Sequence, residues 1–370
     1  MSSDEIDAMT EAAGLGPKDQ LGDWVLIVPV VNLEIKADIS EEFMVNRVCF
    51  ISVGKLRRVH KRFNLRKTVF SDNTDNLFKD FFNIPNSFYP FKTFAVVKFK
   101  GVPTQCLTDL NKLIEKELNI LLCSNIGWDM RKYPLGIFLS TDRLRSVKTE
   151  VILKKNEVTG NLSNSVKYSP VPFRLDKRWA NFQKRFYFTT LLKALYGKNK
   201  LASKNWRDTI ERAVILVGQA QNSNDLAFCF LKNMIAIEML LTDANDKYST
   251  ILPERIEAFI GWVGYWQTDD YKKRVDALYI KRCKLVHDGN TSNIKPEDIL
   301  FSDDLIFNIL HNIIRNIRLF PTKDSLIKYS DKVKAEKLLG IKSKVQPKTL
   351  EHFNRQYEES DYQKILKNFS

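Results

Sequence analysis

Two residues of this chain, Arg282 and His287, carry the chemistry needed to cleave a phosphodiester, and four residues separate them in the sequence. An imidazole that titrates near neutrality can move a proton, and a guanidinium can bind a phosphate through two parallel hydrogen bonds. Together they could support metal-free RNA cleavage, in which the ribose 2′-hydroxyl attacks its own phosphodiester. The alternative is structural, because short patterns recur by chance and a histidine followed by Asp288 is often only a helix cap.

The stretch around these residues, 279–290, is predicted to form the last two turns of a helix. Its leucine and valine side chains give it an apolar face, and Gly289-Asn290 supplies a left-handed stop. A histidine at a helix C-terminus lies among unpaired carbonyls, which favour its protonated form. On a helix, Arg282 and His287 point about 140° apart and lie about 7.5 Å apart along the axis. One protomer therefore cannot form a compact site from both, whereas two copies meeting across a symmetry axis could.

An acidic residue, Glu238, interrupts the most apolar predicted helix, residues 225–241. A carboxylate among apolar side chains is costly unless it is paired. Arg282 or Arg255 could be the partner. With Arg282 it would orient the guanidinium at the site, and with Arg255 it would close a buried ion pair that serves stability alone. We favour the pairing with Arg255.

The order of these segments resembles the Apea-like branch of the HEPN superfamily (higher eukaryotes and prokaryotes nucleotide-binding). The resemblance covers about residues 200–320, with a weaker likeness over 174–197. Its most specific part is a long apolar helix with one glutamate, a turn, a second helix and then R-x-x-x-x-H-x-G. The segments that carry it are 234–241, 246–248, 252–259 and 279–290.

The resemblance implies an all-α HEPN helical bundle that pairs into homodimers, and many members are metal-independent endoribonucleases whose Arg and His face each other across the dimer. It implies that Arg282 binds and neutralises the scissile phosphate and that His287 acts as general acid/base or stabilises developing charge. We expect Glu238 and Asp288 to support them. Cys283 departs from the pattern, because many HEPN nucleases have a small polar residue directly after the Arg.

The resemblance also implies a role in bacterial or phage conflict, in which such enzymes cut cellular RNA, often tRNA. An unrestrained ribonuclease would harm its host, so a regulatory or neutralising partner is expected. The alternative is a catalytically inactive HEPN module that binds nucleic acid or a partner protein. A basic N-terminal sensor that switches the helical domain on is compatible with either.

Positive charge is concentrated outside the predicted helical domain. The net charge of +14 divides into +11 for residues 1–200, −1 for 201–320 and +4 for 321–370. Residues 55–67 hold seven basic residues and no acidic one, and at helical spacing Leu56, Val59 and Phe63 form an apolar stripe. This arrangement predicts an RNA-binding face, because basic surfaces attract polyanions. A solvated helix face, with charge that serves solubility, is the alternative. The outward side chains are Arg57, Arg58, Lys61 and Arg62.

Patterns along the chain predict an α+β protein with an N-terminal mixed α/β domain followed by a helical bundle. We expect a flexible leader at 1–20, a basic α/β domain at 21–170, a HEPN-like helical domain at 175–320 and a basic helical tail at 321–370. Strands are predicted at 24–31 with a break at the proline, 45–53, 93–100, 135–139 and 150–154. Helices are predicted at 103–124, from 176 to 197, from Ser203, at 225–241, from Pro253, and at 271–288, 303–318, 325–339 and 350–366.

Composition narrows the class of protein. No apolar run approaches the length of a membrane span, and the acidic N-terminus lacks a signal-peptide pattern, so a cytoplasmic location is expected. The five cysteines show no C-x-x-C spacing, which argues against disulfides and a zinc site. We expect no metal and no cofactor.

Overall fold

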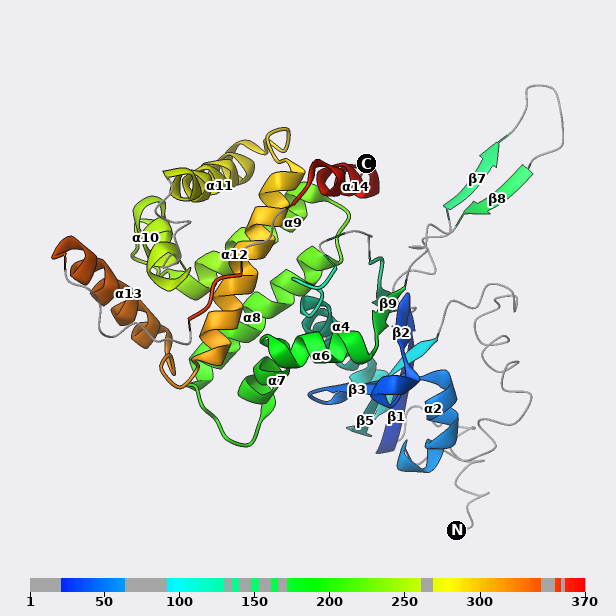
Figure 1. Ribbon diagram of the computed structural model, residues 1–370. Helices are drawn as coiled ribbons and strands as arrows, with labels where there is room; N and C mark the ends of the chain where they lie inside the picture. The colour runs from blue at the N-terminus through cyan, green and yellow to red at the C-terminus, as the bar shows by residue number, and fades with distance from the viewer. Residues whose placement is uncertain are drawn as a thin grey trace, which may run out of the picture. The chain divides into compact units, whose positions relative to one another are not determined.

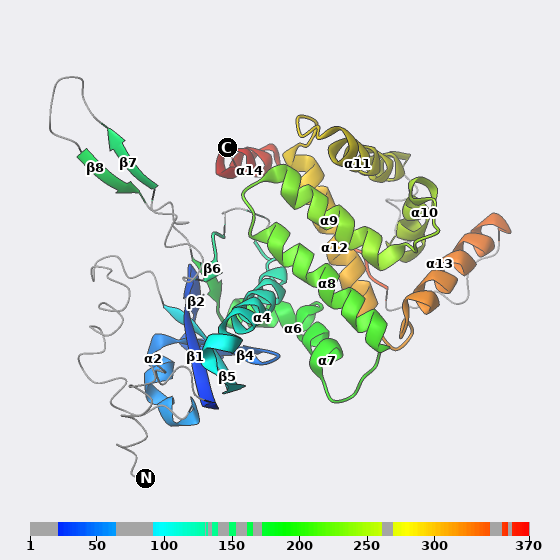
Figure 2. The ribbon, with the colours of Figure 1, turned by 180° about the vertical axis from the view of Figure 1, so that it is seen from behind.

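The computed structural model divides the chain into two compact units, each described here by itself (Figures 1 and 2). The described residues are 21–63, 92–129, 131, 135–139, 148–152, 161–165, 172–260, 269–340, 350–353 and 357–369. The first unit comprises residues 1–117 and 136–177, and the second comprises 118–135 and 178–370. The protein is α+β, with a strand-containing N-terminal unit and a helical C-terminal unit. Among the described helices, none is both long and apolar enough to cross a bilayer.

The N-terminal unit is built on a five-stranded antiparallel sheet in the order β3-β4-β5-β1-β6. The strands predicted at 24–31 and 93–100 are confirmed as β1 and β5. The break expected at Pro29 is absent, because β1 is paired on one side only before Val30 and a strand edge tolerates a proline. The strand expected at 45–53 is confirmed as β4 but begins at Val48, because a turn with the left-handed residue Asn46, whose φ is 46°, joins it to an unpredicted strand, β3. The strands are β1 (Gly22–Val31), β3 (Glu42–Val45), β4 (Val48–Ser52), β5 (Thr93–Gly101) and β6 (Phe138–Leu139).

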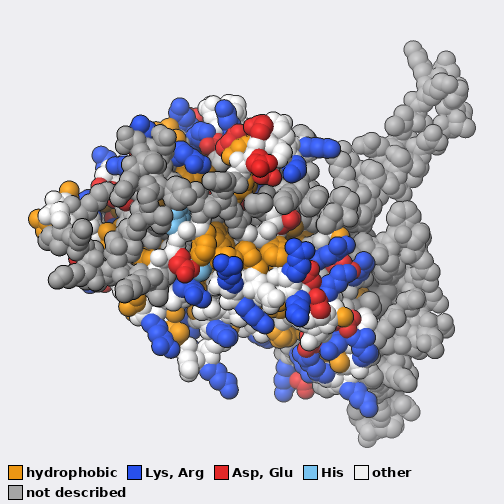
Figure 3. Space-filling model, in the orientation of Figure 1, with side chains coloured by type: hydrophobic (Ala, Val, Ile, Leu, Met, Phe, Trp, Pro, Cys, Tyr) orange, Lys and Arg blue, Asp and Glu red, His pale blue; other side chains and the backbone are white. Residues whose placement is uncertain are grey.

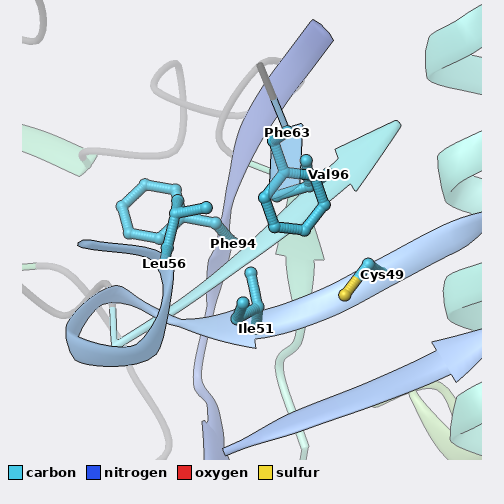
Figure 4. Packing of buried hydrophobic residues seen from close by; sticks show 6 residues of the cluster. All are labelled: Cys49, Ile51, Leu56, Phe63, Phe94 and Val96. Carbon is cyan, nitrogen blue, oxygen red and sulfur yellow. The ribbon is translucent and has the colours of Figure 1, made fainter. Parts of the chain in front are cut away.

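One face of this sheet is covered by the short helix α2 (Val53–Arg58) and the 3-10 turn η3 (His60–Phe63). Leu56 and Phe63 are buried and Val59 is partly buried, so the predicted apolar stripe is confirmed. Burying each such side chain contributes about 1.5–3 kcal/mol. The helix ends earlier than expected, and residues 64–67 lie outside the described part. The buried cluster consists of Cys49, Ile51, Leu56, Phe63, Phe94 and Val96 (Figure 4).

Two further strand pairs belong to the N-terminal unit. β2 (Leu33–Ile35) pairs in parallel with β9 (Phe173–Leu175), and the Arg174 Nε–Glu34 Oε2 ion pair of 3.1 Å spans them. β7 (Lys148–Ile152) pairs antiparallel with β8 (Asn161–Ser165). The first pair therefore ties the end of the N-terminal unit's second segment, 136–177, to its first segment.

The helical unit is centred on α9, which lies between α8 and α12 (Figures 1 and 2). Ser203 caps α8 through a hydrogen bond from the Trp206 backbone N–H, as its sequence position predicted. The helices are α4 (Pro103–Cys123), which continues from the first unit into the second, α6 (Lys177–Arg185), α7 (Phe188–Tyr196), α8 (Lys204–Gln221), α9 (Leu226–Leu241), α10 (Tyr248–Ile260), α11 (Asp269–Asp288), α12 (Pro296–Arg315), α13 (Lys323–Leu338) and α14 (Glu359–Phe369).

Several helix boundaries differ from the expectations. The helix expected from 176 to 197 is two helices, and α10 begins five residues before Pro253. α12 begins at Pro296 rather than 303, because its proline needs no N–H partner and the Asp298 carboxylate accepts a hydrogen bond from the Lys295 backbone N–H at 2.8 Å. The last tail helix occupies 359–369, not 350–366.

Residues 118–135 belong to the helical unit, whereas the sequence pattern assigned them to the N-terminal domain. Arg131 explains their position. Its guanidinium is buried and donates to both carboxylate oxygens of Asp303, at 2.5 and 3.0 Å. Gln221 and Asn233 donate to the same carboxylate at 3.1 and 2.6 Å. Four hydrogen bonds from three segments thus converge on one acidic side chain.

Candidate functional site

The candidate site is built on α11, which occupies residues 269–288 as the motif predicted. Val275 and Leu278 are buried on its inner side. Lys281 Nζ lies 2.7 Å from each carboxylate oxygen of Asp298, which fixes α11 against α12. The helix ends at Asp288, and Gly289 follows with a φ of 63°, which is the predicted left-handed stop. α11 is therefore held in one rotational setting.

Arg282 points from α11 toward α9, where its Nη2 donates to Glu238 Oε2 at 2.8 Å. The pairing of Glu238 with Arg255 that we favoured from the sequence is therefore wrong. Arg255 instead pairs with Asp246 and donates to the Leu241 carbonyl at 2.7 Å. The physical reason is the early start of α10, which places Arg255 beside the turn that follows α9. The carboxylate of Glu238 lies one turn further back along α9.

The ion pair between Arg282 and Glu238 lies at the edge of the helical unit, with side-chain exposures of 20% and 7%. Burial raises the pKa of Glu238, and the adjacent guanidinium offsets part of that rise. Glu238 Oε1 and Arg282 Nε are also buried, and neither has a hydrogen-bond partner among the described residues. The pair is therefore incompletely satisfied, and such groups call for an explanation in function or strain.

Tyr279 and Cys283 flank Arg282 on α11, and their sequence pattern had suggested no role for either side chain. Burial, together with the neighbouring Cys283 thiol, raises the pKa of Tyr279 to about 12. The phenol thus stays protonated at neutral pH and can act only as a hydrogen-bonding group. Tyr279 and Cys283 are four residues apart on a helix, and this spacing is the sequence signal that could have revealed the contact between them.

His287 lies in the last turn of α11 and is exposed, as is Asp288. Ile280, two turns earlier, is 53% exposed and falls on the same side of the helix as His287. Arg282, in contrast, faces inward to Glu238. A single protomer therefore does not bring the arginine and the histidine together, as the helical spacing predicted. His287 therefore lies on an exposed face of α11.

The predicted RNA-binding residues are less available than their sequence suggested. Arg58 forms an ion pair with Glu41, and Arg62 forms one with Glu42 at 2.7 Å. Lys61 is exposed, whereas the side chain of Arg57 lies outside the described part of the structure. Figure 3 shows acidic side chains between the basic ones over this region. The two paired arginines do not form a free basic face.

Within the described residues, no three His, Cys, Asp or Glu side chains gather in a way that could hold a metal ion. Comparison of the chain with models of protein families, with curated proteins and with solved structures gave no match. The geometry of α11 and the resemblance of its motif are thus the grounds for a functional proposal.

Proposed function

We propose that the chain is a cytoplasmic, homodimeric endoribonuclease of the HEPN type that cleaves RNA without a metal ion. One observation carries the proposal. A helix ends in an exposed His287, and five residues earlier it carries Arg282, whose guanidinium is held by Glu238. This is the arrangement that the R-x-x-x-x-H resemblance implies.

In the proposed dimer, Arg282 of one subunit and His287 of the partner subunit flank one phosphodiester. The guanidinium neutralises the non-bridging oxygens, for which its forked donors are suited. One imidazole accepts the proton of the ribose 2′-hydroxyl, and the 2′-oxygen attacks phosphorus. The bond to the 5′-oxygen breaks, and that oxygen takes up a proton from water. The products are a 2′,3′-cyclic phosphate and a free 5′-hydroxyl.

Glu238 is a positioning residue in this proposal, because it touches Arg282 and not the RNA. The Glu238 carboxylate accepts a hydrogen bond from Nη2 of Arg282 and leaves the exposed part of the guanidinium free to bind a phosphate. The exposed Asp288 follows His287 and is assigned a supporting part beside it. Loss of positioning of this kind lowers rates by up to about 100-fold.

The test is incubation of the purified protein with tRNA and total RNA in EDTA, followed by analysis of the fragment ends. We expect 2′,3′-cyclic phosphate ends that disappear in Arg282→Ala and His287→Ala. Lys284→Ala, an exposed change on the same helix, is the matched control and should leave cleavage unchanged. Sedimentation of each variant establishes whether it remains folded and dimeric. Cleavage that persists in both variants would show that another site or a contaminant is responsible.

A second candidate function is a catalytically inactive HEPN module that binds nucleic acid or a partner protein. The observation that favours it is the pairing of Arg282 with Glu238, since this carboxylate already balances the guanidinium charge. Under this alternative the wild-type protein binds RNA and releases no fragments. A role in bacterial or phage conflict, with a regulatory or neutralising partner, belongs to the first proposal.

A further inference from the structure

A hollow of about 520 Å³ opens on the sheet of the N-terminal unit, beside the buried cluster under α2. Val25 lines it and also packs against that cluster, so the hollow begins where the apolar cover ends. Its volume falls within the range of about 300–1,000 Å³ that is typical of ligand sites. Its lining residues come from β1, β5 and the β3–β4 turn: Asp23, Trp24, Val25, Arg47, Lys98, Phe99 and Lys100.

The strand register determines which of these side chains share a face. Asp23 is opposite Lys100, and Val25 is opposite Lys98. Because side chains alternate along a strand, these four lie on one face, and Trp24 and Phe99 point to the other. Arg47, in the β3–β4 turn, lines the same hollow. Three cations and one carboxylate therefore surround the hollow.

These cations differ from the arginines of α2 and η3 in their partners. Arg47 and Lys100 are exposed and form no ion pair among the described residues. Lys98 donates to the Arg62 backbone carbonyl and lies 5.8 Å from the Phe63 ring centroid, and no acidic side chain of the described residues pairs with it. Arg58 and Arg62, by contrast, each have a glutamate partner. Within the part of the chain that the structure describes, Arg47, Lys98 and Lys100 thus lack the acidic partners that Arg58 and Arg62 have.

We propose that this cleft binds the phosphate backbone of single-stranded RNA, with Arg47, Lys98 and Lys100 as the contacts. Lys98 and Lys100 are two residues apart on one strand, roughly 6.6 Å, a spacing that suits successive phosphates of one strand. The aromatic rings on this face, Phe63 and Phe94, are buried in the cluster, so binding follows the backbone and is independent of base sequence. The choice of RNA as the polyanion rests on the proposed function.

The experiment measures the salt dependence of RNA affinity in the full chain. A fluorescent oligouridylate of about 20 nucleotides exceeds the roughly 4–16 nucleotides that single-strand-binding domains contact. His287→Ala is the parent protein, which keeps the RNA intact. Each phosphate contact contributes about −0.7 to the slope of log K against log salt for a single strand. Arg47→Gln with Lys100→Gln should therefore flatten the slope by about 1.4 and weaken binding about 10-fold at 0.15 M salt.

Two controls accompany this pair. Lys198→Gln with Lys200→Gln makes the same charge change at exposed positions of the helical unit and should leave the slope at the parent value. Asp23→Asn removes the one carboxylate of the cleft and should tighten binding about 2- to 4-fold. An unchanged slope in the cleft pair, or an equal change in the control pair, would overturn the assignment. Displacement of RNA by inorganic phosphate, beyond that by chloride at equal ionic strength, would show a free-phosphate site instead.

Cleavage is measured separately, in variants that retain His287. Binding that depends on the cleft without cleavage in any variant supports the cleft and contradicts the ribonuclease proposal. Cleavage together with an unchanged salt slope in the Arg47→Gln, Lys100→Gln variant supports the ribonuclease proposal and contradicts the cleft. The two proposals therefore fail independently.

Discussion

Asp303 offers the most demanding test of how the helical unit is held together. Its carboxylate accepts four hydrogen bonds, two from Arg131 and one each from Gln221 and Asn233. All three partner residues are donors in these four bonds, so Asp303→Asn must turn an amide N–H₂ toward at least one of them. The change also leaves the buried Arg131 guanidinium without a counter-charge. We expect a severe loss of stability, although the two side chains have the same shape.

The size of the loss follows from the burial of the pair. Removing one partner of a buried ion pair costs about 3–5 kcal/mol. The helical unit contains about 210 residues, and 1 kcal/mol shifts the Tm of a domain of this size by about 2–4 °C. Asp303→Asn should therefore lower the Tm of the helical unit by roughly 6–20 °C.

Thermal unfolding followed by far-UV circular dichroism measures this shift. Asp324→Asn is the matched control, because Asp324 pairs with Lys328 on the surface and such pairs contribute at most about 0.5 kcal/mol. Adding Arg131→Met to Asp303→Asn removes the unpaired charge, so the double variant should lose less than the sum of the singles. A Tm within about 4 °C of wild type for Asp303→Asn would refute the buried pair.

Three further predictions concern packing, pH and pairing. Gly218→Ala should destabilise by about 1–3 kcal/mol in urea unfolding, because its Cβ would lie 1.8 Å from the backbone oxygen of Asn119. Burial lowers the pKa of His311 and outweighs the opposite effect of its partner Glu351. His311 therefore contributes stability above its ordinary pKa, and this stability is lost as the pH falls through the lowered pKa. The difference between the Tm at pH 7.5 and the Tm at pH 5.5 should be smaller in His311→Gln than in the wild type. Mixing Arg282→Ala with His287→Ala protein should restore part of the cleavage, since mixed dimers hold one intact pair, and no recovery would argue against a shared site.

The elements that the sequence predicted well are those with a long, regular pattern. α4 and α9 came within one residue of their expected bounds, because apolar residues recur at helical spacing through both. The stop of α11 at Gly289 was predictable from local chemistry alone. The start of α12 was predictable in principle, since Lys295-Pro296 is followed by two acidic residues.

The features that the sequence did not reveal depend on contacts between distant residues. The turn at Asn46-Arg47 is only two polar residues long between two apolar segments, so the β3–β4 hairpin was missed although Asn favours this turn. The partners of Arg58 and Arg62 lie 17 and 20 residues earlier and face them only once the hairpin has formed. Arg131 lies in a segment without periodicity. Its partner, Asp303, is 172 residues away in the sequence, so the ion pair becomes visible only in the folded structure.

The pair of Glu238 and Arg282 joins the stability of the helical unit to the proposed chemistry. Burial raises the pKa of Glu238, so the ionised carboxylate is disfavoured there and only the guanidinium makes it tolerable. Apolar residues in both positions would be neutral or more stable by about 1–4 kcal/mol. Stability therefore does not require the pair. What the pair does is tie α9 to α11 at one rotation, with Arg282 facing inward. That rotation leaves His287 exposed and directed away from Arg282.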